Sequence, residues 1–302
     1  MNNDHLMTPL KDLNLTNRFL FDQVMEDTGT LEDVLSIILE KDIHLLFPGQ
    51  TEKEQRISPL AKSVRMDVFS MDEEQTVYNT EMQTKKLPDL AKRSRYYQSL
   101  MDTSLLEPGN LDYNQLNNSY LIMIMTFDLF GAGKYRYTFR SRCEEAPDCL
   151  LKDGATRIFL NTKGQNDSEV SEELVEFLKY AENTTALTAK AAKSPRLSRI
   201  HQRVCTVRAS EEIGVKYMQA WEEKYYDKKE AREEGLAEGL AEGRSEGLAL
   251  GRAEGEQNKL RQQIEKKLAR GKSVSEIAEA LEEEEDTVRK MIQEIQNGRE
   301  AK

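Results

Sequence analysis

The stretch that most restricts how this chain can fold is the apolar run YLIMIMTFDLF at residues 120–130. A strand with apolar side chains on both faces is typical of a sheet that helices cover on both sides. The run is too short to cross a bilayer as a helix, which takes about 20 apolar residues. The sequence therefore predicts a sheet buried beneath helices, in a protein without a membrane segment.

Hydrophobic periodicity supplies the other strands and the helical cover. The predicted strands span residues 64–70, 76–83, 120–130, 134–143 and 155–164, and the predicted helices span 15–46, 88–106 and 171 to about 226. Thr30 is expected to be an N-cap within the first helical region, with Asp33 at the N3 position. Residues 47–59 contain two prolines and a glycine, which predicts a loop. We therefore expect a mixed α/β domain over residues 1–226.

Charge and cysteine content narrow the class of protein. The 302 residues include 43 Lys and Arg against 54 Asp and Glu, a formal net charge of −11. This balance argues against a protein that coats nucleic acid through bulk charge, and leaves room for local basic patches. The three cysteines, Cys143, Cys149 and Cys205, form no C-x-x-C pair. We expect reduced thiols in a cytoplasmic protein, since no secretory signal is visible in the sequence.

Beyond residue 226 the sequence changes to a glycine repeat. In EEGLAEGLAEGRSEGLALGRAEGE, glycine recurs at every fourth position from 235 to 255. Glycine costs a helix about 1 kcal/mol per position relative to alanine, so an isolated helix would be weak. A glycine stripe also lets two helices approach closely. We expect residues 227–258 to form a helical, coiled-coil-like oligomerisation segment, most simply in a homodimer; a flexible solvated linker is the alternative.

The remaining residues, 259–302, are predicted to form two or three short helices. SVSEIAEAL followed by EDTVRKMIQEI has the cadence of a helix-turn-helix. The turn carries EEEED, five acids where DNA phosphates would lie in a DNA-reading motif. A small oligomerisation or protein-contact bundle is therefore favoured over DNA reading for this tail.

Two acids stand in the predicted hairpin where apolar residues would suit a buried sheet. Asp67 lies in the first strand and Glu81 nearly opposite it in the second, and Gln83 projects on the same face as Glu81. Facing carboxylates repel, and burying unpaired charge is costly. A divalent cation between them would resolve the conflict, and carboxylate oxygens suit Mg²⁺ or Mn²⁺. The alternative is that both acids lie on the exposed face of an edge hairpin.

The order of these motifs resembles a known superfamily. RMDVFS, YNTEMQT and AKRSRYYQSLMD follow one another as in the PD-(D/E)XK nucleases. More narrowly, the chain resembles the Rpn-type recombination-promoting nucleases, also called PD-(D/E)XK nuclease family transposases. LTNRFLFDQVM, LDYNQLNNSYLIMIMTFDLFG, GATRIFLNTKG and RASEEIGVKYMQAWEE extend the resemblance over roughly residues 14–226. It implies a restriction-endonuclease-like mixed α/β sheet flanked by helices, with a helical C-terminal tail.

The resemblance also implies an activity and its residues. Asp67 takes the place of the family's metal-binding aspartate, Glu81 the acid of the E-x-K/Q motif, and Gln83 its last position. Glu32, in the first helical region, is the candidate for a further acid that binds the metal. The implied function is Mg²⁺- or Mn²⁺-dependent hydrolysis of DNA phosphodiester bonds in transposition or recombination. The alternative is a catalytically weak nuclease-fold module that binds DNA or protein as an oligomer, for example in phage defence.

Three basic clusters mark where DNA could bind: KKLPDLAKRSR (85–95), KYRYTFRSR (134–142) and KAAKSPRLSRIHQRVCTVR (190–208). Their candidate DNA-binding residues are Arg93, Arg95, Tyr96, Lys134, Arg196, Arg199 and Arg203. Such side chains would contact phosphates and position a strand without reading its sequence. The first cluster follows the acid hairpin directly, so we expect it nearest the scissile strand. A solvated helix face is the alternative for each cluster.

Overall fold

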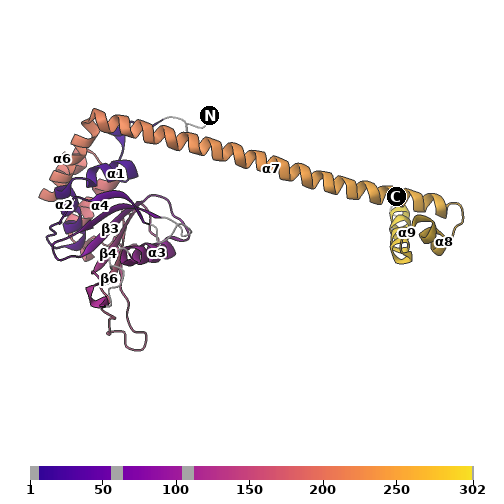
Figure 1. Ribbon diagram of the computed structural model, residues 1–302, viewed down its shortest axis with the longest axis horizontal. Helices are drawn as coiled ribbons and strands as arrows, with labels where there is room; N and C mark the ends of the chain where they lie inside the picture. Colours follow the sequence, from indigo (N-terminus) through magenta and orange to yellow (C-terminus); the bar gives the residue numbers. More distant parts are fainter. Residues whose placement is uncertain (1–6, 56–63, 104–111, 301–302) are drawn as a thin grey trace. The chain divides into compact units, whose positions relative to one another are not determined.

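The structure is a computed structural model that describes residues 7–55, 64–103 and 112–300 (Figure 1). The chain divides into two compact units, Met1–Trp221 and Glu222–Lys302. The first unit contains a sheet with helices on both faces, and the described part of the second consists of helices joined by short turns. Each unit is described by itself below.

The first unit is built on a six-stranded mixed sheet in the order β1-β2-β3-β4-β6-β5. The strands are β1 (Gln50–Gln55), β2 (Val64–Met71), β3 (Val77–Gln83), β4 (Ser119–Met125), β5 (Arg136–Phe139) and β6 (Ala155–Asn161). β1, β2 and β3 form an antiparallel meander, β3, β4 and β6 run parallel, and β5 closes the far edge antiparallel to β6. This is the mixed α/β sheet that the sequence predicts.

Strand β1 corrects the prediction of a loop at 47–59, of which residues 56–59 lie outside the described part. The sequence of β1, QTEKEQ, has no apolar side chain, so it lacks the alternation by which a strand is recognised. β1 pairs with β2 along its length, from Gln50 opposite Phe69 to Gln55 opposite Val64. An edge strand can therefore form through backbone bonding to an apolar neighbour while its own sequence remains polar.

Helices cover both faces of the sheet (Figure 1). The helices of the first unit are α1 (Arg18–Met25), α2 (Thr28–Leu39), α3 (Leu90–Thr103), α4 (Glu172–Glu182), α5 (Ala186–Ala191) and α6 (Pro195–Ala209), with 3₁₀ turns at Leu10–Asp12, Tyr113–Gln115 and Asp167–Glu169. Tyr78 and Met82 of β3 pack into the core beneath α1, α2, α4 and α6. Val77, on the opposite face of β3, packs with Tyr97 and Met101 of α3. The sheet is thus buried on both sides.

Helix α2 begins three residues earlier than the sequence predicts. Its N-cap is Asp27, whose Oδ2 accepts hydrogen bonds from the backbone N–H of Thr30 at 2.9 Å and from the Thr30 hydroxyl at 2.7 Å. The prediction of Thr30 as N-cap is therefore wrong: Thr30 lies in the first turn and is itself bonded to the cap. Asp33 is buried and accepts a bidentate pair of hydrogen bonds from Arg199 of α6.

The second unit contains most of α7 (Glu211–Leu268), followed by α8 (Val274–Leu281) and α9 (Glu285–Glu300). Ile264 of α7 packs with Ile277 of α8 and with Val288 and Ile295 of α9. A capping box between Ser273 and Glu276 starts α8. The predicted short helices of the tail are therefore present and share one apolar cluster.

The glycine repeat lies inside α7 and is helical from end to end. Among the described residues, no atom lies within 4 Å of a Cβ built at Gly235, Gly239, Gly243, Gly247, Gly251 or Gly255. The side chains of Leu236, Leu240, Leu248 and Leu250 beside them are exposed. No helix in the described ranges is long and apolar enough to cross a membrane.

Candidate active site

The two acids of the predicted hairpin lie face to face on neighbouring strands. The ladder between β2 and β3 runs from Met71–Val77 to Val68–Thr80, and Asp67 and Glu81 are the next residues on each strand. At this position the side-chain carboxylates accept hydrogen bonds from backbone N–H groups of the neighbouring strand. The backbone N–H of Asp67 donates to Oε1 of Glu81 at 3.1 Å, and that of Met82 donates to Oδ2 of Asp67 at 3.0 Å.

Both acids are buried, which excludes the alternative of an exposed hairpin face. Asp67 is 2% exposed and Glu81 4% exposed. Alternation along β3 places Glu81 on the face of Val77 and Asn79, which is the face that α3 covers. Asn79 is also buried, and its Nδ2 donates to Oε1 of Glu81 at 3.0 Å. The site therefore combines two buried carboxylates with fixed hydrogen-bond donors.

Helix α1 brings a cation to the first of these acids. Nη2 of Arg18 lies 2.5 Å from Oδ1 of Asp67, and Nε of Arg18 lies 3.7 Å from Oδ2 of Asp22, one helical turn further on. The side chain of Arg18 is 40% exposed, whereas that of Asp67 is 3% exposed. A guanidinium on a partly exposed side chain thus stabilises the charge of a buried carboxylate.

The proton affinity of Glu81 is shifted far from that of an ordinary glutamate. Burial, and next the charge of Asp67, raise the pKa of Glu81 to about 8. The hydrogen bonds from Asp67 and Asn79 and the charge of Arg93 act in the opposite direction and are weaker. The negative charge of Glu81 is therefore only partly matched by the residues around it. A carboxyl group in this condition gains from a further cation.

Helix α3 covers the sheet face on which the acid pair lies. Nε of Arg93 donates to the hydroxyl of Tyr97 at 2.6 Å, and the guanidinium lies 4.9 Å from the centre of the Tyr97 ring. Burial raises the pKa of Tyr97, and the charges of Glu81 and Asp67 raise it further. The charge of Arg93 lowers the pKa of Glu81, so this face of α3, which covers the acids' side of the sheet, lies within electrostatic range of them.

Gln83 and Glu32, the other two residues predicted for catalysis and metal binding, make their hydrogen bonds elsewhere. Nε2 of Gln83 donates to the backbone carbonyl of Lys85 at 2.6 Å. Oε1 of Glu32 accepts the backbone N–H of Leu45 at 2.8 Å, in the segment after α2. A different acid of the first helical region is connected to Asp67: Asp22 of α1, which is 6% exposed. Arg18 contacts both acids.

The predicted DNA-binding residues divide into two groups. On α6, Arg196 pairs with Asp42 and Glu173, Arg199 pairs with Asp33, and Nη2 of Arg203 donates to the carbonyl of Gln23. Lys134 pairs with Glu169 at 2.6 Å. These four cations thus stabilise contacts within the unit. Arg93, Arg95 and Tyr96 all lie on α3, with Arg93 bonded to Tyr97, Arg95 exposed and Tyr96 half-buried.

The donor set at the acids fits a divalent cation. Asp67 and Glu81 offer carboxylate oxygens, which are hard ligands suited to Mg²⁺ and Mn²⁺. The raised pKa of Glu81 marks a negative charge that its protein neighbours leave partly unmatched. Within the described residues, no group of three or more His, Cys, Asp or Glu side chains could enclose a metal. Two carboxylates suffice for Mg²⁺, which keeps several waters and commonly adds substrate phosphate oxygens.

A mixed six-stranded sheet under helices, with a buried acid pair on its second and third strands, has the PD-(D/E)XK-like α/β fold. Residues 19–235 match the family model described as PD-(D/E)XK nuclease family transposase. The chain therefore belongs to this family of nuclease-fold, transposase-related proteins. Comparisons with curated proteins and with solved structures give no significant match.

Sequence reasoning named Arg93 as a DNA-binding candidate and missed Arg18, Asp22 and Tyr97 around the acids. Arg18 and Asp22 in NRFLFD, and Arg93 and Tyr97 in RSRYY, are each four residues apart and so share a helix face. That spacing indicates a pair within one helix. The spacing does not indicate that these faces of α1 and α3 contact the same hairpin. That contact depends on how the two helices pack against β2 and β3.

Proposed function

We propose that the chain is a divalent-metal-dependent deoxyribonuclease that hydrolyses DNA phosphodiester bonds in transposition or recombination. The observation that carries the proposal is the buried pair of Asp67 and Glu81, whose carboxylates bridge two strands in a protein of this nuclease family. Burying two acids side by side lowers stability unless a cation compensates them. A site that keeps this arrangement is suited to binding Mg²⁺ or Mn²⁺.

The residues would divide the work as follows. Asp67 and Glu81 hold the cation, which when bound supplies Lewis-acid polarisation of the phosphate and lowers the pKa of a coordinated water. Asn79 and the backbone N–H of Asp67 fix the Glu81 carboxylate in place. Arg18, whose Nη2 pairs with Oδ1 of Asp67, would give up that contact if the cation took the same oxygen. Arg93, held by Tyr97 on the helix that covers the acids, would contact the phosphate that is cleaved.

A plasmid assay tests the proposal. Supercoiled DNA is incubated with purified protein and Mg²⁺, Mn²⁺ or EDTA, and nicked and linear products are quantified. We expect cleavage with the divalent cations only, and at least a hundredfold loss in Asp67→Ala and Glu81→Ala with the circular dichroism spectrum unchanged. Glu73→Gln, in the exposed turn between the strands, is the control and should cleave normally. Equal cleavage by wild type and Asp67→Ala would contradict the mechanism.

A second function is favoured by one observation, the position of Gln83. The amide is neutral, and its Nε2 donates to the carbonyl of Lys85, so it adds no positive charge near the acids. The chain would then be a catalytically weak nuclease-fold module that binds DNA or protein. This alternative predicts a thermal shift with Mn²⁺ that Asp67→Ala removes, together with no plasmid cleavage. Activity gained on Gln83→Lys would assign the weakness to this residue.

A further inference from the structure

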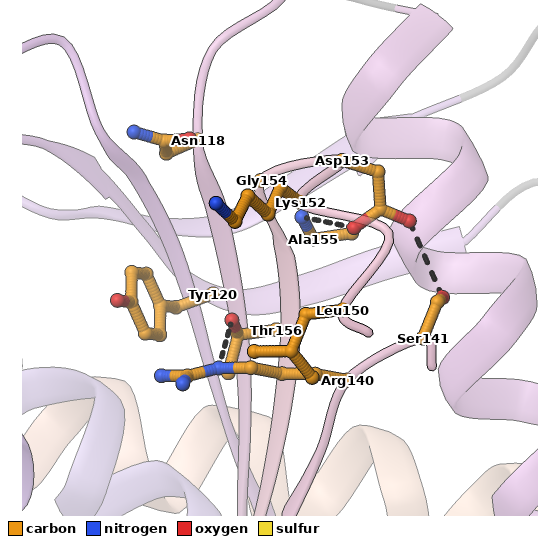
Figure 2. A pocket seen from close by; sticks show the side chains of 10 residues that line it. All are labelled: Asn118, Tyr120, Arg140, Ser141, Leu150, Lys152, Asp153, Gly154, Ala155 and Thr156. Atoms are coloured by element: carbon orange, nitrogen blue, oxygen red, sulfur yellow. Dashed lines mark hydrogen bonds between the residues drawn. The ribbon is translucent and has the colours of Figure 1, made fainter. Parts of the chain in front are cut away.

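A pocket of about 320 Å³ lies at the end of the sheet where β4 and β6 begin (Figure 2). Asn118 and Tyr120 line it at the start of β4, and Thr156 lines it from β6. Arg140 and Lys152 line it from the two ends of the connection between β5 and β6. Glu81 lies near the opposite end of β3, in register with Phe159 through Met123. At the usual strand spacing and rise, Thr156 is roughly 14 Å from Glu81 between backbones, so this is a separate site.

Two cations are directed into this pocket. Figure 2 shows the guanidinium of Arg140 and the ammonium of Lys152 both extending toward the side where Tyr120 and Asn118 lie. Nε of Arg140 donates to Oγ1 of Thr156 at 3.4 Å, which helps to hold its side chain across the opening. Tyr120 is stacked on Tyr78 with ring centres 5.6 Å apart, so it forms a rigid wall.

The acid in the lining does not neutralise these cations. Oδ1 of Asp153 accepts the backbone N–H of Ala155 at 3.2 Å, and Oδ2 accepts the hydroxyl of Ser141 at 3.3 Å. Figure 2 shows this carboxylate on the side of Ser141, away from the guanidinium of Arg140. Asp153 therefore fixes the connection between the strands, and within the described residues neither Arg140 nor Lys152 forms an ion pair with it or with another acid.

The backbone at the pocket is held in an uncommon conformation. Lys152 has a φ of 58°, in the left-handed region that costs a residue with a side chain on the order of 1 kcal/mol. Gly154 has a φ of 77°, and a Cβ there would lie 2.5 Å from Oδ1 of Asn118. Gly154 thus lies close against Asn118, and its carbonyl accepts the backbone N–H of Ser119 at 3.0 Å. Strain of this kind persists where the surrounding structure enforces it, commonly at binding sites.

Several other cations of the first unit pair with acids. Arg136 of β5 pairs with Glu40 at 2.6 Å and Lys193 with Glu172 at 2.6 Å, as do the α6 arginines with their partners. A second pocket of about 200 Å³ shares Arg140, Ser141 and Asp153 with the first and adds Arg95 and Arg157. Basic side chains therefore line both pockets. The second pocket also contains one additional acid, Asp102.

We propose that Arg140 and Lys152 form a phosphate-binding site at this end of the sheet. A phosphate offers several acceptor oxygens to a guanidinium and an ammonium, and Asn118 and Tyr120 can donate to the same group. The continuation of the charge toward Arg95 and Arg157 favours a phosphate of a DNA strand. In that form the site rests on the proposed nuclease function.

The test measures DNA binding without cleavage. Full-length protein in EDTA is titrated into a fluorescein-labelled 20-nucleotide DNA, as a single strand and as a duplex, at salt concentrations from 50 to 200 mM. We expect Arg140→Gln with Lys152→Gln to weaken binding about tenfold and to lower the salt slope by about two. Arg140→Lys should retain most of the slope because it keeps the charge. Lys11→Gln, an exposed lysine outside the pocket, should change nothing.

A second arm identifies the source of the phosphate. Inorganic phosphate and a deoxynucleoside monophosphate are titrated calorimetrically into wild type and the double variant. Binding of these probes that is lost in the double variant, with unchanged DNA affinity, would support the site and assign it to a free phosphate or nucleotide. Unchanged DNA affinity and unchanged binding of both probes would overturn it. Plasmid cleavage is scored separately, so a wild type that binds DNA through Arg140 and Lys152 yet never cleaves would overturn only the nuclease proposal.

Discussion

At the scale of single residues, Glu81 illustrates how burial changes the acid–base behaviour of a carboxyl group. Its pKa is raised to about 8 by burial and by the charge of Asp67, against about 4.3 in an unfolded chain. Between these values the folded protein binds a proton that the unfolded chain has released. Linkage therefore requires that the free energy of unfolding falls as pH rises from about 4.3 to about 8.

Replacing Glu81 with glutamine should remove this pH dependence. Glutamine is neutral, and its side-chain oxygen can still accept the hydrogen bonds from Asp67 and Asn79. In EDTA we expect Glu81→Gln to be more stable than wild type at pH 8.5, by on the order of 2 kcal/mol. At pH 4.5 the two should be about equally stable. Urea unfolding across this pH range measures the difference, with Glu73→Gln as the control; a parallel loss of stability in Glu81→Gln would contradict the assignment.

Arg18 gives a second prediction at this scale. Its Nη2 lies 2.5 Å from Oδ1 of Asp67, one of the oxygens that this acid would offer to a metal. Arg18→Gln should destabilise the metal-free protein by about 1–3 kcal/mol, less than for a fully buried pair because Arg18 is partly solvated. Mn²⁺ should restore the loss, so the thermal shift with Mn²⁺ should exceed that of wild type. Arg18→Lys should fall between them, and a smaller shift in Arg18→Gln would count against this competition.

A contact of the site could be predicted when both residues belong to one hairpin, and could not when it joins elements that are distant in sequence. Asp67 and Glu81 could be identified because a short hairpin fixes which residues face each other, and the spacing of two strands is visible in the sequence. The contact of Arg18 with Asp67 spans two elements whose meeting depends on the packing of the whole core. Glu32 was chosen from the same helical region without such a constraint, and the structure bonds it to Leu45 instead.

At the scale of elements, strands with apolar faces were predictable and the polar edge strand was not. β4 is apolar along almost its whole length, and its neighbours bury both of its faces. β1 depends on backbone bonding to β2, and no periodicity of QTEKEQ reports that bonding. The cap of α2 was displaced for a similar reason, since Asp27 and Thr30 are both good cap residues and only the fold decides between them.

The glycine repeat of α7 makes a prediction about assembly. Each glycine costs about 1 kcal/mol relative to alanine in a helix, and no described atom comes close to these positions. The homodimer that we propose through this segment would offset that cost, since two helices could meet closely along the stripe. Gly243→Ala with Gly247→Ala should raise the thermal stability of the isolated helix and weaken self-association at least tenfold.

Sedimentation velocity over a concentration series measures the association, and circular dichroism measures the helix. Ser245→Ala is the control, because residue 245 lies away from the glycine stripe and changes size by a similar amount. A wild type that remains monomeric at every concentration would contradict the pairing, as would equal association of the glycine variants.

At the scale of the whole molecule, the net charge of −11 conceals an uneven distribution. Many basic residues of the first unit pair with acids and stabilise the contact of α6 with α2 and α4. The cations that stay out of such pairs within the described residues include Arg140 and Lys152, at the phosphate-binding site proposed above. A basic cluster in the sequence therefore says little about nucleic-acid binding until the fold decides which of its members are neutralised.

The division into two units predicts two separate unfolding events. Ile277 is fully buried in the apolar cluster of the second unit, whereas Ile122 is fully buried in the core of the first. Ile277→Ala should cost the second unit about 2–5 kcal/mol, enough to unfold so small a cluster well below the transition of the first unit. The shift of the first transition with Mn²⁺ should be unchanged in this variant, because the carboxylate pair lies wholly in the first unit.

Ile122→Ala, the matched substitution, should lower the first transition and leave the second where it was. Scanning calorimetry with and without Mn²⁺ separates the two events, and a single transition that moves as a whole in both variants would show that the units unfold together.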